Sequence, residues 1–201
     1  MKVINTPAIT AVVVRHLITN SADGSLYSSG YVIFDVFQGN FRAIKPGESW
    51  ESTDSFREGA VNLAIGAPDS TFKYEFSFVA AATDEPAVVG DPEYAVRIKQ
   101  RRKAYYDFES EFIPLLARTR GGQVQVDGLL SEVESLKADL LSRALSAEER
   151  SVHEGITRSF VLNLRNYRAA HSSGLVADTE IVRWRQQYEK RRAELIPLLI
   201  P

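Results

Sequence analysis

The chain has 201 residues, of which 44% are apolar and 25% charged, a balance typical of a globular protein that excludes wholesale disorder. A formal net charge of −2 offers no general attraction for nucleic acid, and the absence of cysteine excludes disulfides, thiol catalysis and thiolate metal sites. Residues 1–90 carry 6 basic and 10 acidic side chains (net −4), whereas residues 91–201 carry 18 and 16 (net +2). No apolar run approaches the roughly 20 residues that span a bilayer.

The first part of the chain predicts short strands joined by turns. Ala8–Ile18 is rich in valine, isoleucine and threonine, and a strand is favoured there over a signal peptide because the apolar run is short. Asn20–Gly24 predicts a turn, and Leu26–Phe37 predicts a strand that is central or covered on both sides, because both of its faces carry apolar residues. Further strands are predicted over Phe41–Ile44, Ala60–Ile65 and Thr71–Val79.

The clearest alternation lies in Thr71–Val79, where an aromatic residue occupies every second position: Phe72, Tyr74, Phe76 and Phe78. A period of two predicts that this aromatic face packs on a core while the other face meets water; a ligand-binding wall is the alternative. On the core interpretation, Phe76→Ala removes about 3–5 kcal/mol of stability. Five or more strands without intervening helices predict an antiparallel β-sandwich, either immunoglobulin-like or jelly-roll-like.

The segment of residues 80–92 is rich in small and acidic residues and contains proline, a composition typical of a linker. It predicts a boundary between two domains. The expected fold class is α+β, with an N-terminal antiparallel β-sandwich followed by a C-terminal antiparallel helical domain. The expected division is a β-sandwich domain over residues 1–83, a linker over 84–92, and a helical domain of about four helices over 93–201.

The stretch Asp91–Arg120 predicts the first long helix, capped by Asp91, with Pro114 as a bend or terminator. One stripe of this helix is apolar and predicts its core face: Ile98, Tyr105, Phe108, Phe112, Leu115 and Leu116.

Three further helices are predicted from periodicity and capping signals. The second covers Asp127–Leu145, and the third begins with a capping box formed by Ser146 and Glu149. The fourth is capped by Asp178 or Thr179 and ends at Pro197. Short breaks between the helices predict that they fold back antiparallel on one another.

No arrangement of residues predicts catalysis. The histidines are His16, His153 and His171, and the last two lie about 27 Å apart along one helix, too far to share a metal ion. Structural or surface positions are therefore expected for all three. Phosphate-binding loops, nucleophile elbows and metal motifs are absent from the sequence. We expect no enzyme activity, no cofactor and no metal site.

Three features suggest contacts with other molecules. The basic stretch Arg97–Lys103 stands beside two tyrosines, but the acidic residues that follow favour a solvated or intersubunit salt-bridged face over nucleic acid. Trp50 is the best candidate for an exposed aromatic contact, although a buried tryptophan is more common. The apolar tail Leu195–Ile200 either folds back onto its own bundle or inserts into a neighbouring subunit, and insertion into the neighbour is favoured. The candidate interaction residues are Trp50, Arg97, Arg101, Arg102, Tyr105, Tyr106, Trp184, Leu198, Leu199 and Ile200.

These features predict a non-enzymatic structural or adaptor subunit of a large assembly, most specifically a virion component of a phage head, neck or tail. Its partners are expected to be other copies of itself and other assembly subunits. The alternative is a secreted lectin-like or membrane-binding β-sandwich toxin module, which binds glycan or lipid through the acidic first half and Trp50.

Overall fold

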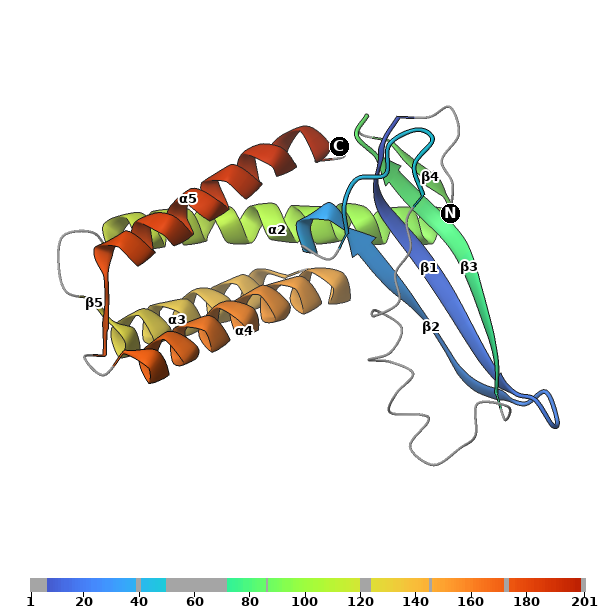
Figure 1. The fold of residues 1–201 in the computed structure, drawn as a ribbon, viewed down its shortest axis with the longest axis horizontal. Coiled ribbons are helices and arrows are strands. Elements are labelled where there is room, and N and C mark those ends of the chain that lie inside the picture. Colours follow the sequence, from blue (N-terminus) through green and yellow to red (C-terminus); the bar gives the residue numbers. More distant parts are fainter. Residues whose placement is uncertain are drawn as a thin grey trace. The chain divides into compact units, whose positions relative to one another are not determined.

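The computed structural model describes residues 7–38, 41–49, 72–85, 87–119, 124–144, 146–171 and 174–199. The chain divides into two compact units, Met1–Ile98 and Lys99–Pro201, and the division falls inside the first long helix. The first unit is built on strands and the second on helices, so the fold is mixed α+β (Figure 1). Along the described part of the chain, no helix combines the length and apolar character that a membrane span requires.

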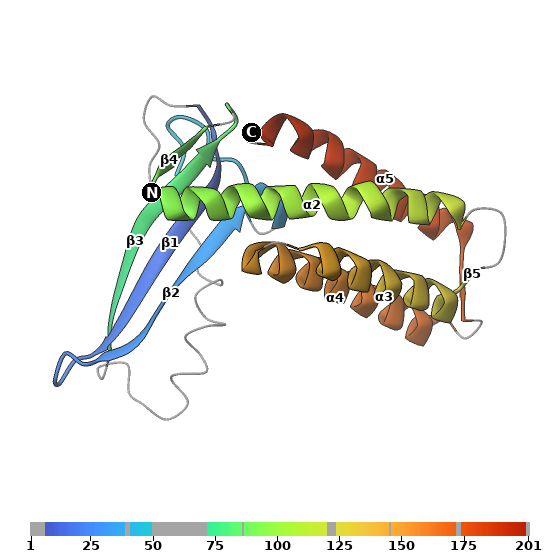
Figure 2. The ribbon, with the colours of Figure 1, turned by 180° about the vertical axis from the view of Figure 1, so that it is seen from behind.

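The first unit contains a four-stranded antiparallel sheet with the strand order β2-β1-β3-β4. The paired strands twist along their whole length (Figure 2). The described elements are β1 (Ile9–Asn20), β2 (Leu26–Asp35), the 3-10 turn η1 (Val36–Gln38), β3 (Phe72–Thr83) and β4 (Val88–Gly90).

The predicted sandwich is not confirmed, because the described residues of the first unit contain one sheet and not two facing sheets. The predicted strand Ala60–Ile65 lies outside the described residues. Phe41–Ile44 forms no strand and contributes one bridge, between Ile44 and Ile9. β2 lies at the edge of the sheet and not at its centre, although Ile33 and Phe34 on its two faces are both buried.

The two faces of the sheet are covered by different segments. On one face, Val12, Val14 and Phe34 form a core with Phe41 and Ile44. Because apolar side chains from β1 and β2 lose their contact with water there, this cluster fixes the register of the β1–β2 hairpin.

The first turns of the helix α2 (Pro92–Arg118) pack on the other face of the sheet. The rings of Tyr31 and Tyr94 meet edge to face with centroids 5.3 Å apart, and Arg97 donates a 2.5 Å hydrogen bond to the Tyr31 hydroxyl. The guanidinium of Arg97 also lies 4.6 Å from the centroid of the Tyr31 ring. Within the segment predicted as a linker, Val88–Gly90 forms β4, which pairs with β3. The predicted domain boundary stays a prediction.

The structure corrects the prediction that the aromatic face of β3 packs on a core. Tyr74, Phe76 and Phe78 are 37%, 52% and 54% exposed, so the expected core packing of this face is wrong for these three residues. Alternation identifies side chains that share a face, but the layer that covers a face comes from other segments, which a strand's own pattern does not contain. On the same face, Val14 and Ile18 of β1 stay buried, opposite Phe78 and Tyr74 in the strand register.

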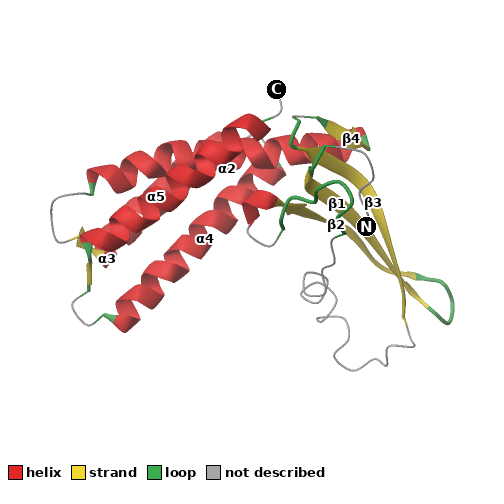
Figure 3. Cartoon of the chain, turned by 45° about the horizontal axis from the view of Figure 1, so that its top comes forward, coloured by secondary structure: helices red, strands yellow, loops and turns green. Residues whose placement is uncertain are grey.

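Among its described residues, the second unit contains α2 from Lys99 onward, three further helices, two short strands and a 3-10 turn (Figure 3). These elements are β5 (Val124–Gln125), α3 (Val126–Arg143), α4 (Ala147–Ala170), β6 (Leu175–Val176), α5 (Asp178–Leu195) and the 3-10 turn η3 (Ile196–Leu198). The short strands β5 and β6 pair antiparallel beside the ends of the helices.

Neighbouring helices run antiparallel, as ion pairs along their lengths show. Arg118 and Glu111 of α2 pair with Glu132 and Arg143 of α3, so residue numbers rise on one helix as they fall on the other. In the same sense, α4 runs back along α3 and α5 runs back along α2.

Phe108, Phe112, Leu115 and Leu116 of the predicted α2 stripe lie in the core of the helical unit. Phe112 is fully buried and contacts Phe160 of α4 and Tyr188 of α5, with ring centroids 4.7 and 4.8 Å away. The six residues of the predicted α2 stripe are all buried. α2 continues through Pro114 because the apolar residues on both sides of the proline belong to this core, whose burial outweighs one missing helical hydrogen bond.

Two of the predicted helix starts are confirmed and one is wrong. The Asp91 carboxylate accepts a 2.9 Å hydrogen bond from the amide of Glu93, and Ser146 and Glu149 form the predicted reciprocal capping box. α5 has Ala177 at its N-cap, with no side-chain cap, and Asp178 already lies within the helix.

Candidate functional site

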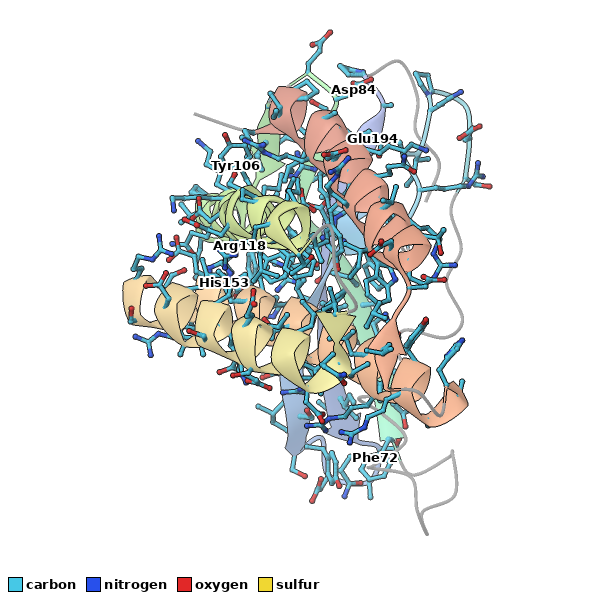
Figure 4. All side chains as sticks on the ribbon, turned by 90° about the vertical axis from the view of Figure 1, so that its left-hand side faces the viewer. Phe72, Asp84, Tyr106, Arg118, His153 and Glu194 are labelled. Atoms are coloured by element: carbon cyan, nitrogen blue, oxygen red, sulfur yellow. The ribbon has the colours of Figure 1, made fainter. Side chains whose placement is uncertain are left out.

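A polar pocket of about 290 Å³ lies within the helical unit, between α2, α3 and the first turns of α4. In Figure 4, His153 is labelled beside these helices. The pocket joins acidic, basic and apolar side chains from the three helices: Lys103, Asp107, Ser110, Glu111, Leu140, Arg143, Ala144, Glu149 and His153.

The charged groups of the pocket are linked by ion pairs. The Lys103 ammonium lies 2.6 Å from a carboxylate oxygen of Asp107 and 3.8 Å from one of Glu149. The hydrogen bond to Asp107 raises the pKa of Lys103 above its ordinary value. Across the pocket, the Arg143 guanidinium lies 3.5 Å from Glu111 and also pairs with Asp139.

His153 is the most deeply buried polar side chain of this pocket, with 3% of its surface exposed. Its Nδ1 atom is buried and has no hydrogen-bond partner. Burial lowers the pKa of His153 below its ordinary value of 6.5, while the carboxylates of Asp107 and Glu149 act in the opposite direction. The ring is therefore neutral near pH 7 and retains unused hydrogen-bonding capacity.

Glu149 has two roles that explain its position in the pocket wall. Its carboxylate accepts a 2.9 Å hydrogen bond from the amide of Ser146, which completes the helix cap, and it also faces Lys103. The start of α4 thus fixes one carboxylate of the pocket, since the cap holds this side chain in one orientation.

A second polar cluster joins α2 to α5 through charges buried inside the unit. Glu109 is fully buried and accepts a hydrogen bond from Nε of Arg191. Burial raises the pKa of Glu109 above its ordinary value, and the positive charge of Arg191 opposes this effect. The Arg191 guanidinium also lies over the rings of Tyr188 and Tyr105, 4.8 and 5.5 Å from their centroids.

The structure distributes the predicted basic cluster over several intramolecular contacts. Arg97 pairs with Glu93 at 2.6 Å, and Arg101 lies 3.2 Å from Glu148. Arg102 is fully buried, although the sequence predicts a charged surface, and it donates a 3.1 Å hydrogen bond to the carbonyl of Leu198.

The predicted aromatic contacts lie mainly inside the helical unit. Tyr105 and Trp184 are buried, at 7% and 8% exposure, and the Trp184 ring meets Phe160 edge to face in the core. Tyr106 is partly exposed, and its hydroxyl accepts a hydrogen bond from Arg192. An interaction role for these residues stays a prediction.

At the end of the chain, Leu198 and Leu199 are partly buried on the helical unit, while Ile196 is 52% exposed. Trp50 and Ile200 lie outside the described residues.

Sequence reasoning missed the pocket because its residues come from three separate segments. His153 carries the one available signal, since it directly follows the apolar Val152 on α4, and both residues are buried. In the described ranges, no group of three His, Cys, Asp or Glu side chains is placed to hold a metal ion.

No protein-family model, curated protein or solved structure matches the chain.

Proposed function

We propose that the protein is a non-enzymatic structural or adaptor subunit of a large protein assembly, and that its sheet contacts a neighbouring subunit. One observation carries this proposal: the exposed row of Tyr74, Phe76 and Phe78 on β3, called here the aromatic strip. Exposed aromatic side chains in a contiguous row are typical of a protein–protein contact, because burying them on association removes apolar surface from water.

The turn between β1 and β2 extends the apolar character of this surface. Leu26 and Tyr27, at the start of β2, are 61% and 48% exposed, and the Tyr27 ring contacts Phe72 with centroids 4.7 Å apart. Phe72 comes directly before the aromatic strip on the same face of β3. A neighbouring subunit that covers the strip would therefore bury apolar groups from two strands.

The internal neutralisation of the basic residues supports a protein partner over nucleic acid. Lys103 is paired with Asp107, and Arg101 and Arg191 with buried glutamates. Phosphate binding depends on cations that release counterions from the nucleic acid, and cations already paired within the chain contribute less to that effect. The most specific form of the proposal is a virion component of a head, neck or tail.

The proposal is tested by measuring the mass of the full chain in solution at increasing concentration. We expect association, and we expect the double variant Phe76→Ser, Phe78→Ser to weaken it by about tenfold or more, since each buried phenyl ring contributes on the order of 1.5–3 kcal/mol. The matched control is Lys73→Ser, Glu75→Ser, which removes an exposed ion pair from the opposite face of β3.

Folding of the variants is checked separately. Because Phe76 is half exposed, Phe76→Ala should cost about 1 kcal/mol or less, and not the 3–5 kcal/mol expected for a core position. A chain that stays monomeric at high concentration and in the presence of candidate assembly subunits would contradict the proposal.

The alternative of a lectin-like or membrane-binding module uses the same surface, because aromatic rings also stack on sugars and enter lipid interfaces. Binding of the monomeric chain to glycans or liposomes, abolished by the Phe76→Ser, Phe78→Ser variant, would favour this alternative.

A further inference from the structure

The polar pocket of the helical unit has an excess of negative charge. Three carboxylates line it, from Asp107, Glu111 and Glu149, against the two cations Lys103 and Arg143. The neutral His153 adds no charge. The Arg143 guanidinium is shared between Glu111 and Asp139, so it neutralises the pocket only in part.

Lys103 shows that two of the carboxylates, those of Asp107 and Glu149, can pair with an ammonium group. The primary ammonium of Lys103 lies between Asp107 and Glu149, and its side chain is 60% exposed. A lysine side chain has a flexible four-carbon stem, so an exposed one turns into solvent at little cost. Its departure would leave Asp107 and Glu149 facing an open polar pocket.

His153 gives an independent indication of a missing partner. The ring lines the pocket, and only 3% of the residue's surface is exposed. Its Nδ1 atom has no hydrogen-bond partner. Buried polar atoms are nearly always paired, so the unpaired Nδ1 leaves His153 able to accept one further hydrogen bond. A neutral imidazole offers an acceptor nitrogen, which suits an N–H donor.

Part of the remaining wall of the pocket is apolar. Leu140, which is 3% exposed, and Ala144, which is 8% exposed, line the pocket from α3. An alkyl chain placed against these two residues would have its polar end near the carboxylates and the imidazole.

We propose that this pocket binds a primary alkylammonium group, with its carbon chain along Leu140 and Ala144 and its ammonium between Asp107, Glu149 and His153. The group belongs either to a free amine or to a lysine side chain of another protein, since both present the same chemistry. This inference stands apart from the proposed role of the aromatic strip, because it uses none of the same residues.

The test is a titration of the full chain with n-butylammonium chloride near neutral pH, followed by NMR of the His153 ring. We expect saturable shifts of the ring resonances, whereas sodium butyrate and n-butanol of the same chain length leave them unchanged. Asp107→Asn should weaken binding by about tenfold or more, because it removes a charged hydrogen-bond acceptor.

The matched control is Glu154→Gln, which neutralises the exposed carboxylate next to His153 on α4 without touching the pocket. This variant should bind as the unaltered chain does. If Asp107→Asn fails to fold, Lys103→Ala serves in its place and should tighten binding, because it removes the ammonium that pairs with Asp107 and Glu149.

Two further probes separate the sources of the ammonium. Tighter binding of 1,5-diaminopentane indicates a free amine, and tighter binding of a peptide with blocked ends and one lysine indicates a protein partner. The proposal is overturned if no ammonium probe gives a saturable shift, if butyrate binds as well, or if Glu154→Gln weakens binding as much as Asp107→Asn.

Discussion

Among the described glycines of the first unit, Gly90, the last residue of β4, is the position where a single added methyl group should do most harm. Its φ angle is +107°, and a Cβ atom built there would lie 2.3 Å from the carbonyl oxygen of Val79. That carbonyl accepts a 2.8 Å hydrogen bond from the amide of Asp91, which leads into α2. The close approach therefore holds the start of the helix against the sheet.

We predict that Gly90→Ala lowers the free energy of unfolding by more than about 2 kcal/mol, because it combines backbone strain with a clash against a fixed carbonyl. The matched control is Gly24→Ala, whose φ is +70° but whose Cβ would meet open space. That change should cost only about 1 kcal/mol. Chemical denaturation followed by circular dichroism measures both, and equal losses would contradict the assigned clash.

In the helical unit, stability should depend in a similar way on Glu109, which pairs with Arg191. We predict that Glu109→Ala lowers stability by about 3 kcal/mol, because it leaves the guanidinium of Arg191 without its buried carboxylate. The control is Glu132→Ala, which breaks the exposed pair with Arg118 and should cost less than about 1 kcal/mol. Thermal unfolding of the two variants should therefore differ clearly, and similar midpoints would show that Glu109 and Arg191 contribute no more than a surface pair.

At the level of elements, helices were predicted well because each carries its own signals. Ser146 and Glu149 form the capping box that the sequence indicates, and all six stripe residues of α2 are buried. The failures have a tertiary cause. Arg102 lies in a run of charges yet is fully buried, because a carbonyl from the far end of the chain accepts its hydrogen bond. No local pattern contains that partner.

The strands were harder to interpret for the same reason. The alternation in β3 correctly places Tyr74, Phe76 and Phe78 on one face, but the exposure of that face depends on what packs against it. The pocket around His153 was not predicted, because its walls come from α2, α3 and α4. Periodicity predicted the helices that form these walls, whereas the meeting of their polar side chains depends on packing angles that periodicity does not fix.

The cap of α4 offers the prediction that belongs to this scale. Ser146→Ala should destabilise the helical unit by about 1 kcal/mol, since it removes the acceptor for the amide of Glu149. It should also loosen the first turn of α4, and with it the orientation of Glu149 toward Lys103. Ser142→Ala near the end of α3 is the control, because the exposed Ser142 side chain only donates to a carbonyl of its own helix. Hydrogen exchange that rises at residues 147–150 in the first variant alone would confirm the assignment, and equal exchange in both would contradict it.

At the scale of the whole molecule, the end of the chain connects the last helix to the first. The sequence predicts a tail that inserts into a neighbouring subunit, so that deleting residues 196–201 would leave the monomer folded. The structure supplies a reason to expect otherwise. The carbonyl of Leu198 accepts a hydrogen bond from Arg102, a fully buried cation for which each lost partner is costly.

We therefore predict that a chain ending at Leu195 loses about 1.5–3 kcal/mol of stability, the usual contribution of a hydrogen bond to a charged group. A chain ending at Leu199 keeps the Leu198 carbonyl and should match the full protein. Comparing the two truncations separates the tail's role within its own unit from any role in assembly, because only the shorter chain lacks the Leu198 carbonyl that accepts a hydrogen bond from Arg102. If both truncations unfold at the same denaturant concentration as the full chain while only the shorter one fails to associate, the tail acts between subunits. If the shorter chain is destabilised and the longer one is not, the hydrogen bond between Arg102 and the Leu198 carbonyl stabilises the chain's own helical unit. Association would then depend on the aromatic strip of the first unit.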